Sequence, residues 1–135
     1  MRGFTLVEII VVIAIIGILA TLVIVRYAGK TDQAKVAVAK SQVVDLESAC
    51  TMFQANCSRW PNSLEELVKK PSDCSNWQDG GYLKGTKVPK DPWGHEFVFK
   101  NEGGKIEIIS LGADGQQGGS GYAADISSLS VDETK

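Results

Sequence analysis

The chain contains 135 residues, of which 14 are Lys or Arg and 16 are Asp or Glu, so its formal net charge is −2. This length accommodates one domain and a short additional segment. The charged residues form no basic patch, which argues against nucleic acid as an electrostatically bound partner.

An apolar run begins almost at the N-terminus. From Phe4 to Val25 the chain reads FTLVEIIVVIAIIGILATLVIV, and Glu8 is its only charged residue. A membrane-spanning helix needs about 20 apolar residues, so residues 4–26 are predicted to form a transmembrane helix. The short N-terminus carries Arg2 and is expected on the cytoplasmic side, which leaves the rest of the chain facing outward.

A cleaved secretory signal is the alternative interpretation of this run. The run is longer than the apolar core of about 7–15 residues that signal peptides contain. Arg26 and Tyr27 follow it directly, in place of the small residues of a cleavage site. A retained span is therefore favoured. A charged carboxylate at membrane depth costs about 2.5 kcal/mol or more, so the presence of Glu8 requires an explanation.

Beyond Arg26 the apolar pattern becomes one-sided. Apolar residues alternate spacings of three and four, as on a helix that buries one face. Because no proline occurs before Pro61, one helix is expected from Phe4 to about Asn56, and residues 27–57 continue it into a head. The predicted buried positions are Val36, Ala39, Val43, Leu46, Cys50, Phe53 and Cys57.

Residues 58–135 are expected to form an α+β head. The segment NSLEELVKKP reads as a short helix with Asn62 or Ser63 as its cap. GGYLKG and HEFVFKNEGGKIEIIS have the alternation of strands around a Gly-Gly turn, and they predict a small antiparallel sheet that the helical seam covers. The charged residues of the short helix are expected on a solvated face: Glu65, Glu66, Lys69 and Lys70.

Three cysteines in an outward-facing domain permit one disulfide. Cys50 and Cys57 lie two helical turns apart, about 10 Å along the axis. This exceeds the limit of about 7 Å between the Cα atoms of a disulfide. Cys74 is therefore the partner of one of them. Cys57–Cys74 is favoured over Cys50–Cys74 because Cys57 ends the helix and the bridge would fix the loop that follows. A zinc site lacks a fourth ligand.

The sequence contains no recognisable catalytic constellation, so an enzyme is not expected. His95 has no nucleophile motif beside it and is expected to be a solvated turn residue. Trp60, Trp77 and Trp93 are expected to pack in the core or to fix loops.

The N-terminal segment G-F-T-L-x-E, followed by the apolar helix, resembles the class III signal of type IV pilins and their pseudopilin relatives. The resemblance implies that a prepilin peptidase removes residues 1–3 by cutting after Gly3 and then methylates Phe4. It also implies that Glu8 pairs with the N-terminal amine of a neighbouring subunit during assembly. Such pairing removes the penalty of a buried, unpaired charge.

The head resembles the major pseudopilins of type II secretion systems. The segments SRWPNSLEELV, GGYLKG, VPKDPWGHEFVF and ISLGADGQQGG carry this resemblance in order, and it extends from Gly3 to about Ile126. Relatives often have proline where this chain has Val25, although Gly17 still allows local unwinding of the helix.

The resemblance implies a structural subunit that polymerises into a periplasmic pseudopilus and drives export of folded proteins through an outer-membrane secretin. Before assembly it would be stored in the bacterial inner membrane with its head in the periplasm. The implied partners are other copies through the N-terminal helices, prepilin peptidase, minor pseudopilins, the inner-membrane assembly platform and the secretin. The alternative is a type IV pilin that forms an extracellular fibre for adhesion, motility or DNA uptake.

The loop 111–126, LGADGQQGGSGYAADI, has the composition of a calcium site. Carboxylates and backbone carbonyls, which glycines allow to turn inward, are the ligands that Ca²⁺ prefers. Related pseudopilins bind one structural calcium here. The loop has neither the EF-hand order nor a phosphate-loop motif. The resemblance implies as ligands the side chains of Asp114 and Asp125 and the Leu111 carbonyl, with Gln117 and Ser120 as weaker candidates where relatives often have acidic residues.

Overall fold

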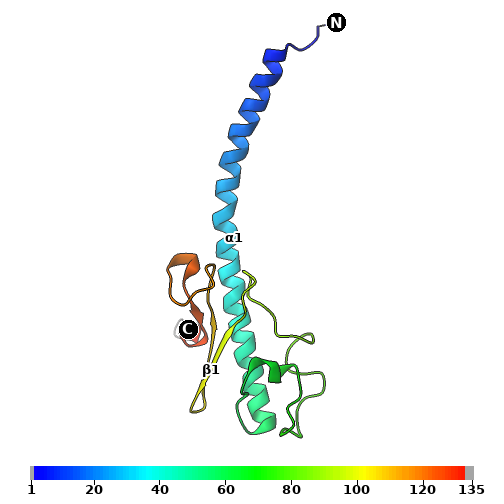
Figure 1. Cartoon of the computed structure of the whole chain (residues 1–135), viewed down its shortest axis with the longest axis vertical. Coiled ribbons are helices and arrows are strands. Elements are labelled where there is room, and N and C mark those ends of the chain that lie inside the picture. The colour runs from blue at the N-terminus through cyan, green and yellow to red at the C-terminus, as the bar shows by residue number, and fades with distance from the viewer. Residues whose placement is uncertain (1, 133–135) are drawn as a thin grey trace. The chain divides into compact units, whose positions relative to one another are not determined.

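The computed structural model describes residues 2–132 and, within this range, all side chains except those of residues 23–30 and 132. The chain divides into two compact units, residues 1–34 and 35–135, and helix α1 (Leu6–Cys57) contributes to both (Figure 1). The remaining elements all belong to the second unit. They are the 3₁₀ helix η1 (Leu64–Leu67), strands β1 (Val98–Glu102) and β2 (Lys105–Ser110), the 3₁₀ helix η2 (Gly121–Ala123), strand β3 (Ile126–Ser127) and helix α2 (Ser128–Asp132).

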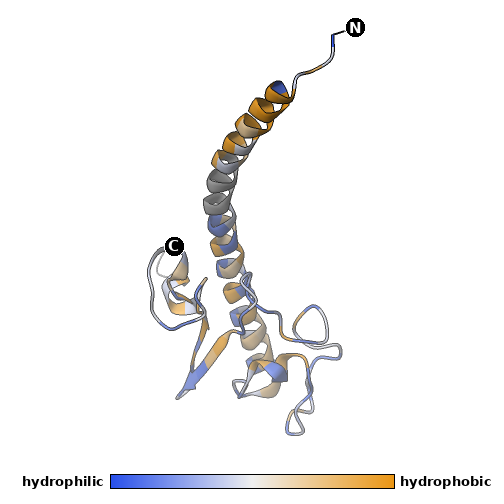
Figure 2. Cartoon of the chain, turned by 45° about the horizontal axis from the view of Figure 1, so that its top comes forward, coloured by the Kyte–Doolittle hydropathy of each residue, from blue (hydrophilic) through white to orange (hydrophobic). Residues whose placement is uncertain are grey.

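The first unit is the apolar part of α1 and the short segment before it. Every described residue from Arg2 to Leu22 is exposed, and most of these residues are apolar (Figure 2). Gly17 lies within α1, where its carbonyl accepts a hydrogen bond from Thr21 Oγ1 at 2.9 Å. A helix that is apolar on all sides requires apolar surroundings.

Among the described residues, no helix has both the length and the apolar character that a membrane span requires. The predicted span 4–26 runs into residues 23–26, whose side chains lie outside the described part of the chain. Val25, the position where relatives often carry proline, falls in the same stretch.

The second unit is built on an antiparallel sheet of order β1-β2-β3. Strands β1 and β2 form a hairpin whose register runs from Val98 opposite Ile109 to Glu102 opposite Lys105. Gly103 and Gly104 connect them with positive φ angles, so the predicted Gly-Gly turn is confirmed. Strand β2 supplies most of the buried sheet residues, and Ile108 is fully buried.

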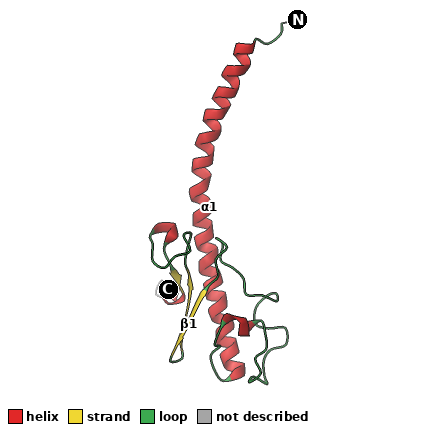
Figure 3. Cartoon of the chain, in the orientation of Figure 1, coloured by secondary structure: helices red, strands yellow, loops and turns green. Residues whose placement is uncertain are grey.

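The C-terminal part of α1 covers this sheet with the predicted seam (Figure 3). The five middle positions, from Ala39 to Phe53, are at most 1% exposed, and Val36 and Cys57 are partly buried against the same cluster. This cluster joins the helix to Ile106, Ile108 and Ile126. The predicted α+β architecture, a long N-terminal helix packed on a small antiparallel sheet, is confirmed.

Two predicted elements of the head differ from the structure. The predicted helix at residues 62–71 is a single 3₁₀ turn, and its N-cap, Ser63, makes no side-chain capping hydrogen bond. The segment GGYLKG forms no strand, because Tyr82 donates its backbone N–H to the Leu67 carbonyl at 2.8 Å instead of to a ladder partner. From Ile126 onward, where no element was predicted, the chain forms β3 and α2, and Ser128 Oγ accepts the buried Ile108 N–H at 3.1 Å.

Candidate functional sites at the N-terminal motif and the glycine loop

The segment before α1 is exposed and has no regular structure. Phe4 is 84% exposed, and a Cβ atom added at Gly3 would meet no atom within 4 Å in this chain. The peptide bond between Gly3 and Phe4 is therefore accessible to a peptidase. Packing within the chain does not demand glycine at position 3, so any such demand comes from a binding partner.

Glu8 closes a reciprocal cap at the start of α1. Its Oε2 accepts the Thr5 backbone N–H at 2.9 Å and the Thr5 hydroxyl at 3.1 Å, while Thr5 Oγ1 accepts the Glu8 N–H at 3.2 Å. This is a capping box, and it places the negative charge at the positive end of the helix dipole. This local role was not predicted, although the T-x-x-E spacing of a capping box is present in the sequence.

The glycine loop between β2 and β3 has two arms, residues 111–115 and 121–125, which lie against each other. The Ala113 N–H donates to the Tyr122 carbonyl at 3.0 Å. Gly112 has a φ of 71°, and a Cβ atom at this position would lie 2.8 Å from the Ala124 carbonyl oxygen. Only glycine fits this crossing of the arms.

The predicted calcium ligands lie on both arms. Asp125 Oδ2 accepts the Gly118 N–H at 2.9 Å, whereas its Oδ1 is buried and has no hydrogen-bond partner among the described residues. Asp114 is exposed, and its Oδ1 accepts the Gln116 N–H at 3.0 Å. Gln117 and Ser120 are exposed and Leu111 is partly buried. In the described part of the chain, no group of three or more His, Cys, Asp or Glu is placed to hold a metal.

The donor set of this loop fits calcium. A buried carboxylate oxygen without a partner carries a desolvation cost that a bound cation would remove. Two carboxylates together with backbone carbonyls and amide oxygens are hard ligands, which suit Ca²⁺ and not the softer transition metals.

A buried aspartate positions the near arm of this loop. Asp91 is 4% exposed, and its Oδ1 accepts the backbone N–H groups of Trp93 and His95 at 3.1 and 2.8 Å. Its Oδ2 accepts the Ser110 hydroxyl at 2.8 Å. The turn DPWGH is thereby fixed to β2 at the point where the glycine loop begins.

His95 extends from this turn onto the loop. Its Nδ1 lies 3.1 Å from the Gly112 carbonyl oxygen, a distance at which a protonated Nδ1 donates a hydrogen bond. A Cβ atom at Gly115 would lie 2.8 Å from His95 Nε2, so the ring lies directly against that glycine. The predicted turn histidine is only partly solvated, because its side chain is 35% exposed and contacts a loop 17 residues away in the chain.

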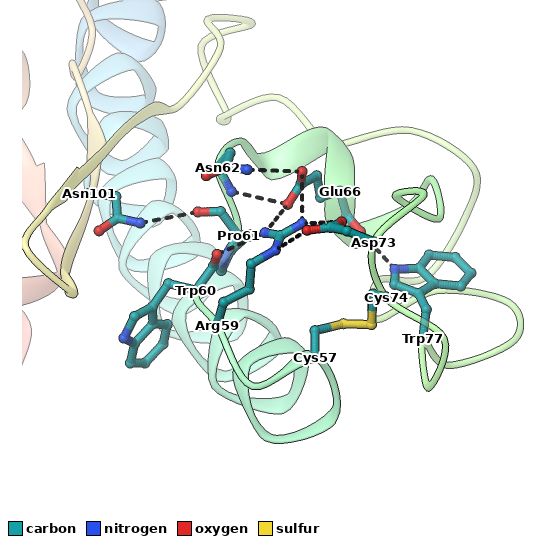
Figure 4. A network of polar contacts seen from close by, with 10 residues as sticks. All are labelled: Cys57, Arg59, Trp60, Pro61, Asn62, Glu66, Asp73, Cys74, Trp77 and Asn101. Atoms are coloured by element: carbon teal, nitrogen blue, oxygen red, sulfur yellow. Dashed lines mark hydrogen bonds and ion pairs between the residues drawn. A yellow bond between two sulfur atoms is a disulfide. The ribbon is translucent and has the colours of Figure 1, made fainter.

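Arg59 forms a second polar centre, which the sequence analysis also missed (Figure 4). Its Nε and Nη2 donate to the two carboxylate oxygens of Asp73 at 2.8 and 2.7 Å. Its Nη1 donates to Glu66 Oε2 at 2.8 Å and to the Trp60 carbonyl at 3.0 Å, and Nη2 also reaches Glu66 Oε1 at 3.4 Å. Glu66 is thus paired across the loop with Arg59, in place of the predicted position on a solvated face.

The charges of this Arg59 network stabilise one another. The hydrogen bonds of Asp73, and then those of Glu66, raise the pKa of Arg59. The guanidinium in turn lowers the pKa of Asp73. For Glu66, burial alone would raise the pKa, but the hydrogen bonds from Arg59 and Asn62 outweigh it and the pKa is lowered. Both carboxylates therefore stabilise the fold above their unfolded pKa values, and this stabilisation is lost as the pH falls through their lowered folded values.

A disulfide joins Cys57 to Cys74, the pair that the sequence favours, with 5.2 Å between their Cα atoms. Cys50 is a free thiol in the buried seam. Burial, followed by the nearby charge of Glu47, raises the pKa of this thiol to about 12. At neutral pH Cys50 is therefore protonated and is a poor nucleophile.

Two segments of the chain match known protein families. Residues 1–24 match the prokaryotic N-terminal methylation motif, which defines the class of proteins to which this N-terminus belongs. Residues 26–129 match the family described as Type II secretion system (T2SS), protein G. The chain belongs to this family.

Individual relatives agree with this assignment. Type II secretion system core protein G of Vibrio cholerae serotype O1 is 40% identical, over 97% of this chain and 93% of that protein. The protein of the same name from Pseudomonas aeruginosa is 45% identical, over 92% of both chains. The crystal structure of the major pseudopilin from the type 2 secretion system of enterohaemorrhagic Escherichia coli matches with a TM-score of 0.62 and 31% identity, over 76% of this chain and 93% of that one.

The contacts of His95 predict a local effect of its removal. His95→Ala is expected to speed hydrogen exchange of the amides in residues 112–118 by more than about threefold. The variant removes one anchor of this loop, while the flanking strands remain paired. Hydrogen exchange read by mass spectrometry on the full-length protein in detergent, without added metal, measures this. Lys100→Ala, on the exposed side of β1, is the matched control and should leave the loop unchanged. Unchanged exchange at 112–118 in His95→Ala would show that the loop is held without this side chain.

Proposed function

We propose that the protein is a structural subunit that polymerises through its N-terminal helix into the pseudopilus of a type II secretion system. The observation that carries this proposal is the exposure of the first part of α1, where every described residue from Arg2 to Leu22 is exposed. An apolar surface of this extent requires lipid before assembly and neighbouring helices afterwards. Membership of the secretion protein G family supports the pseudopilus over a type IV pilus for adhesion, motility or DNA uptake.

In this proposal residues 4–26 hold the newly made subunit in the bacterial inner membrane, with the head in the periplasm. Prepilin peptidase cuts the accessible bond after Gly3 and methylates Phe4, in keeping with the match to the methylation motif. The subunit then joins other copies and minor pseudopilins at the inner-membrane assembly platform. The growing pseudopilus drives folded proteins through the outer-membrane secretin.

Glu8 has two roles in this scheme. Its carboxylate caps its own helix, and it carries the charge that pairs with a neighbouring subunit. Both hydrogen bonds that the Glu8 side chain accepts fall on Oε2, which caps the helix through Thr5. We propose that the same carboxylate carries the charge that meets the N-terminal ammonium of a neighbouring subunit. The pair is formed only in the filament, so it favours assembly over storage of the isolated span.

Glu8→Gln separates these two roles. The amide oxygen still accepts the Thr5 N–H, but the charge is absent. Because breaking a buried ion pair costs about 3–5 kcal/mol, the yield of sheared filaments is expected to fall more than about tenfold while membrane insertion is unchanged. Fractionation and filament shearing from cells without wild-type subunit measure both quantities.

Thr5→Val is the matched control for this prediction. It removes the hydroxyl of the capping box and keeps the carboxylate charge, so it is expected to cost about 1 kcal/mol of helix stability and to retain filaments. Full assembly of Glu8→Gln together with loss of assembly in Thr5→Val would assign Glu8 to capping alone.

We further propose that the loop 111–126 binds one structural calcium ion. The side chains of Asp114 and Asp125 and the Leu111 carbonyl would hold it, with Gln117 and Ser120 as weaker contributors. The partnerless, buried Oδ1 of Asp125 supports this proposal. A calcium ion would add a strong cross-link to a glycine-rich loop whose ordering costs about 1–2 kcal/mol per residue in backbone entropy.

Calcium is expected to raise the thermal unfolding midpoint of the full-length protein in detergent. A ligand that binds only the folded state stabilises it by about 2.7 kcal/mol at a hundredfold excess over Kd. Magnesium should have little effect, because it demands a tighter octahedral shell. Asp114→Ala and Asp125→Ala should abolish the response, whereas Asp79→Asn, outside the loop, should retain it. The same midpoint with chelator and with millimolar calcium would overturn the proposal.

A further inference from the structure

We propose that Arg59 docks the loop between Cys57 and Cys74 before the disulfide forms and thereby directs oxidation to this pair. The disulfide and the ion pair close the same loop. Arg59 follows Cys57 by two residues, and Asp73 immediately precedes Cys74. Figure 4 shows that the Arg59 network and the disulfide both tie the segment after α1 back to residues at the end of this helix.

The network has the geometry to hold this loop without a covalent bond. Three nitrogens of the Arg59 guanidinium make five hydrogen bonds, to Asp73, Glu66 and the Trp60 carbonyl. An arginine that grips a carboxylate with two parallel bonds fixes both its position and its orientation. The carboxylate of Asp73 therefore brings its neighbour Cys74 to the end of α1.

A core residue, Phe53, positions the Arg59 guanidinium from outside the loop. The Arg59 guanidinium lies 5.2 Å from the ring centroid of Phe53, which is fully buried in the helical seam. Glu66 fixes the middle of the loop, because its Oε2 accepts the Asn62 N–H at 3.1 Å and its backbone carbonyl accepts Trp77 Nε1–H at 2.9 Å. None of these contacts involves a sulfur atom, so the reduced chain can make them.

Two links that close one loop share a single entropic cost. The cysteines are separated by 17 positions, and closing a loop of this size costs conformational entropy in the unfolded chain. When the Arg59–Asp73 pair has already closed the loop, the disulfide forms with less further loss of freedom. The ion pair therefore raises the effective concentration of one thiol at the other.

Cys50 is the competitor that this arrangement excludes. It is fully buried in the seam, whereas Cys57 is partly exposed at the helix end. Oxidation removes a proton and an electron from each of the Cys57 and Cys74 thiols and forms their S–S bond. A disulfide oxidant such as oxidised glutathione accepts the two electrons and two protons and is cleaved to two thiols. A loop that is not docked would leave Cys74 free to meet the wrong partner during folding.

The experiment measures the thiol–disulfide equilibrium of the full-length protein in detergent against glutathione buffers of graded ratio. After acid quenching and alkylation in denaturant, mass spectrometry distinguishes chains with one alkylated cysteine from chains with three. Arg59→Ala and Asp73→Asn are each expected to require a buffer about five- to tenfold more oxidising for half oxidation. Arg59→Lys should fall between these variants and wild type, because it keeps the charge but loses the paired geometry.

The controls isolate this effect from a general loss of stability. Lys100→Ala removes a cation whose Nζ lies 3.9 Å from Glu107 Oε2 on the sheet, and it should leave the equilibrium unchanged. The double variant Arg59→Ala/Asp73→Asn should shift the equilibrium no further than the larger single shift, because one shared interaction is removed. Asp73 is 58% exposed at its side chain, so Asp73→Asn tests the proposal even where Arg59→Ala does not fold. Half oxidation of Asp73→Asn at the wild-type buffer ratio would overturn the proposal.

Discussion

The constraint on which the rest of this structure depends is an apolar helix surface that its own chain leaves uncovered. From Arg2 to Leu22 every described residue is exposed, including large side chains such as Leu6 at 78% and Ile18 at 65%. Burying apolar area contributes about 25 cal/mol per Å², so such a surface strongly favours either lipid or further copies of itself. Under the proposed function, lipid before assembly and neighbouring copies afterwards are two ways of satisfying this same constraint.

The same helix changes character along its length, and this change separates the two parts of the molecule. In the first part apolar residues surround the axis, whereas from Lys35 onward one stripe is buried and the remaining faces are polar or partly exposed. Strand β2 packs on this buried stripe through Ile106 and Ile108, and together they form most of the core of the head. Its long irregular segments are held by particular side chains, namely Asp91 and His95 at the glycine loop and Arg59 at the disulfide loop. The head is thus stabilised by its own contacts, as a compact unit of residues 35–135.

The sequence predicted those features that arise from periodicity. Spacings of three and four located the seam from Ala39 to Phe53, and strict alternation with Gly103-Gly104 located the hairpin, because each pattern repeats the geometry of its element. The strand expected at GGYLKG failed for a physical reason. Gly80, Gly81 and Gly85 all have positive φ angles, which are incompatible with an extended strand.

The polar centres were beyond sequence reasoning because their partners are distant in the chain and follow no period. Arg59 meets carboxylates 7 and 14 residues away, and His95 meets a carbonyl 17 residues away. Glu66 was expected on the solvated face of an α-helix, but η1 is a short 3₁₀ turn and the Glu66 carboxylate accepts hydrogen bonds from Arg59. The candidate residues of the N-terminal motif and the glycine loop came from the resemblance to pseudopilins. Their proposed roles involve a peptidase, a neighbouring subunit or a bound ion, so contacts within one chain do not define them.

The most direct test of polymerisation through the apolar part of α1 is a cryo-electron microscopy map of the filament formed by the mature protein. In this map, residues 6–22 of neighbouring subunits are expected to pack against one another around the filament axis, with Glu8 beside the N-terminal amine of the next subunit and the heads on the outside. A filament joined through its heads alone, with residues 6–22 still facing solvent, would contradict it.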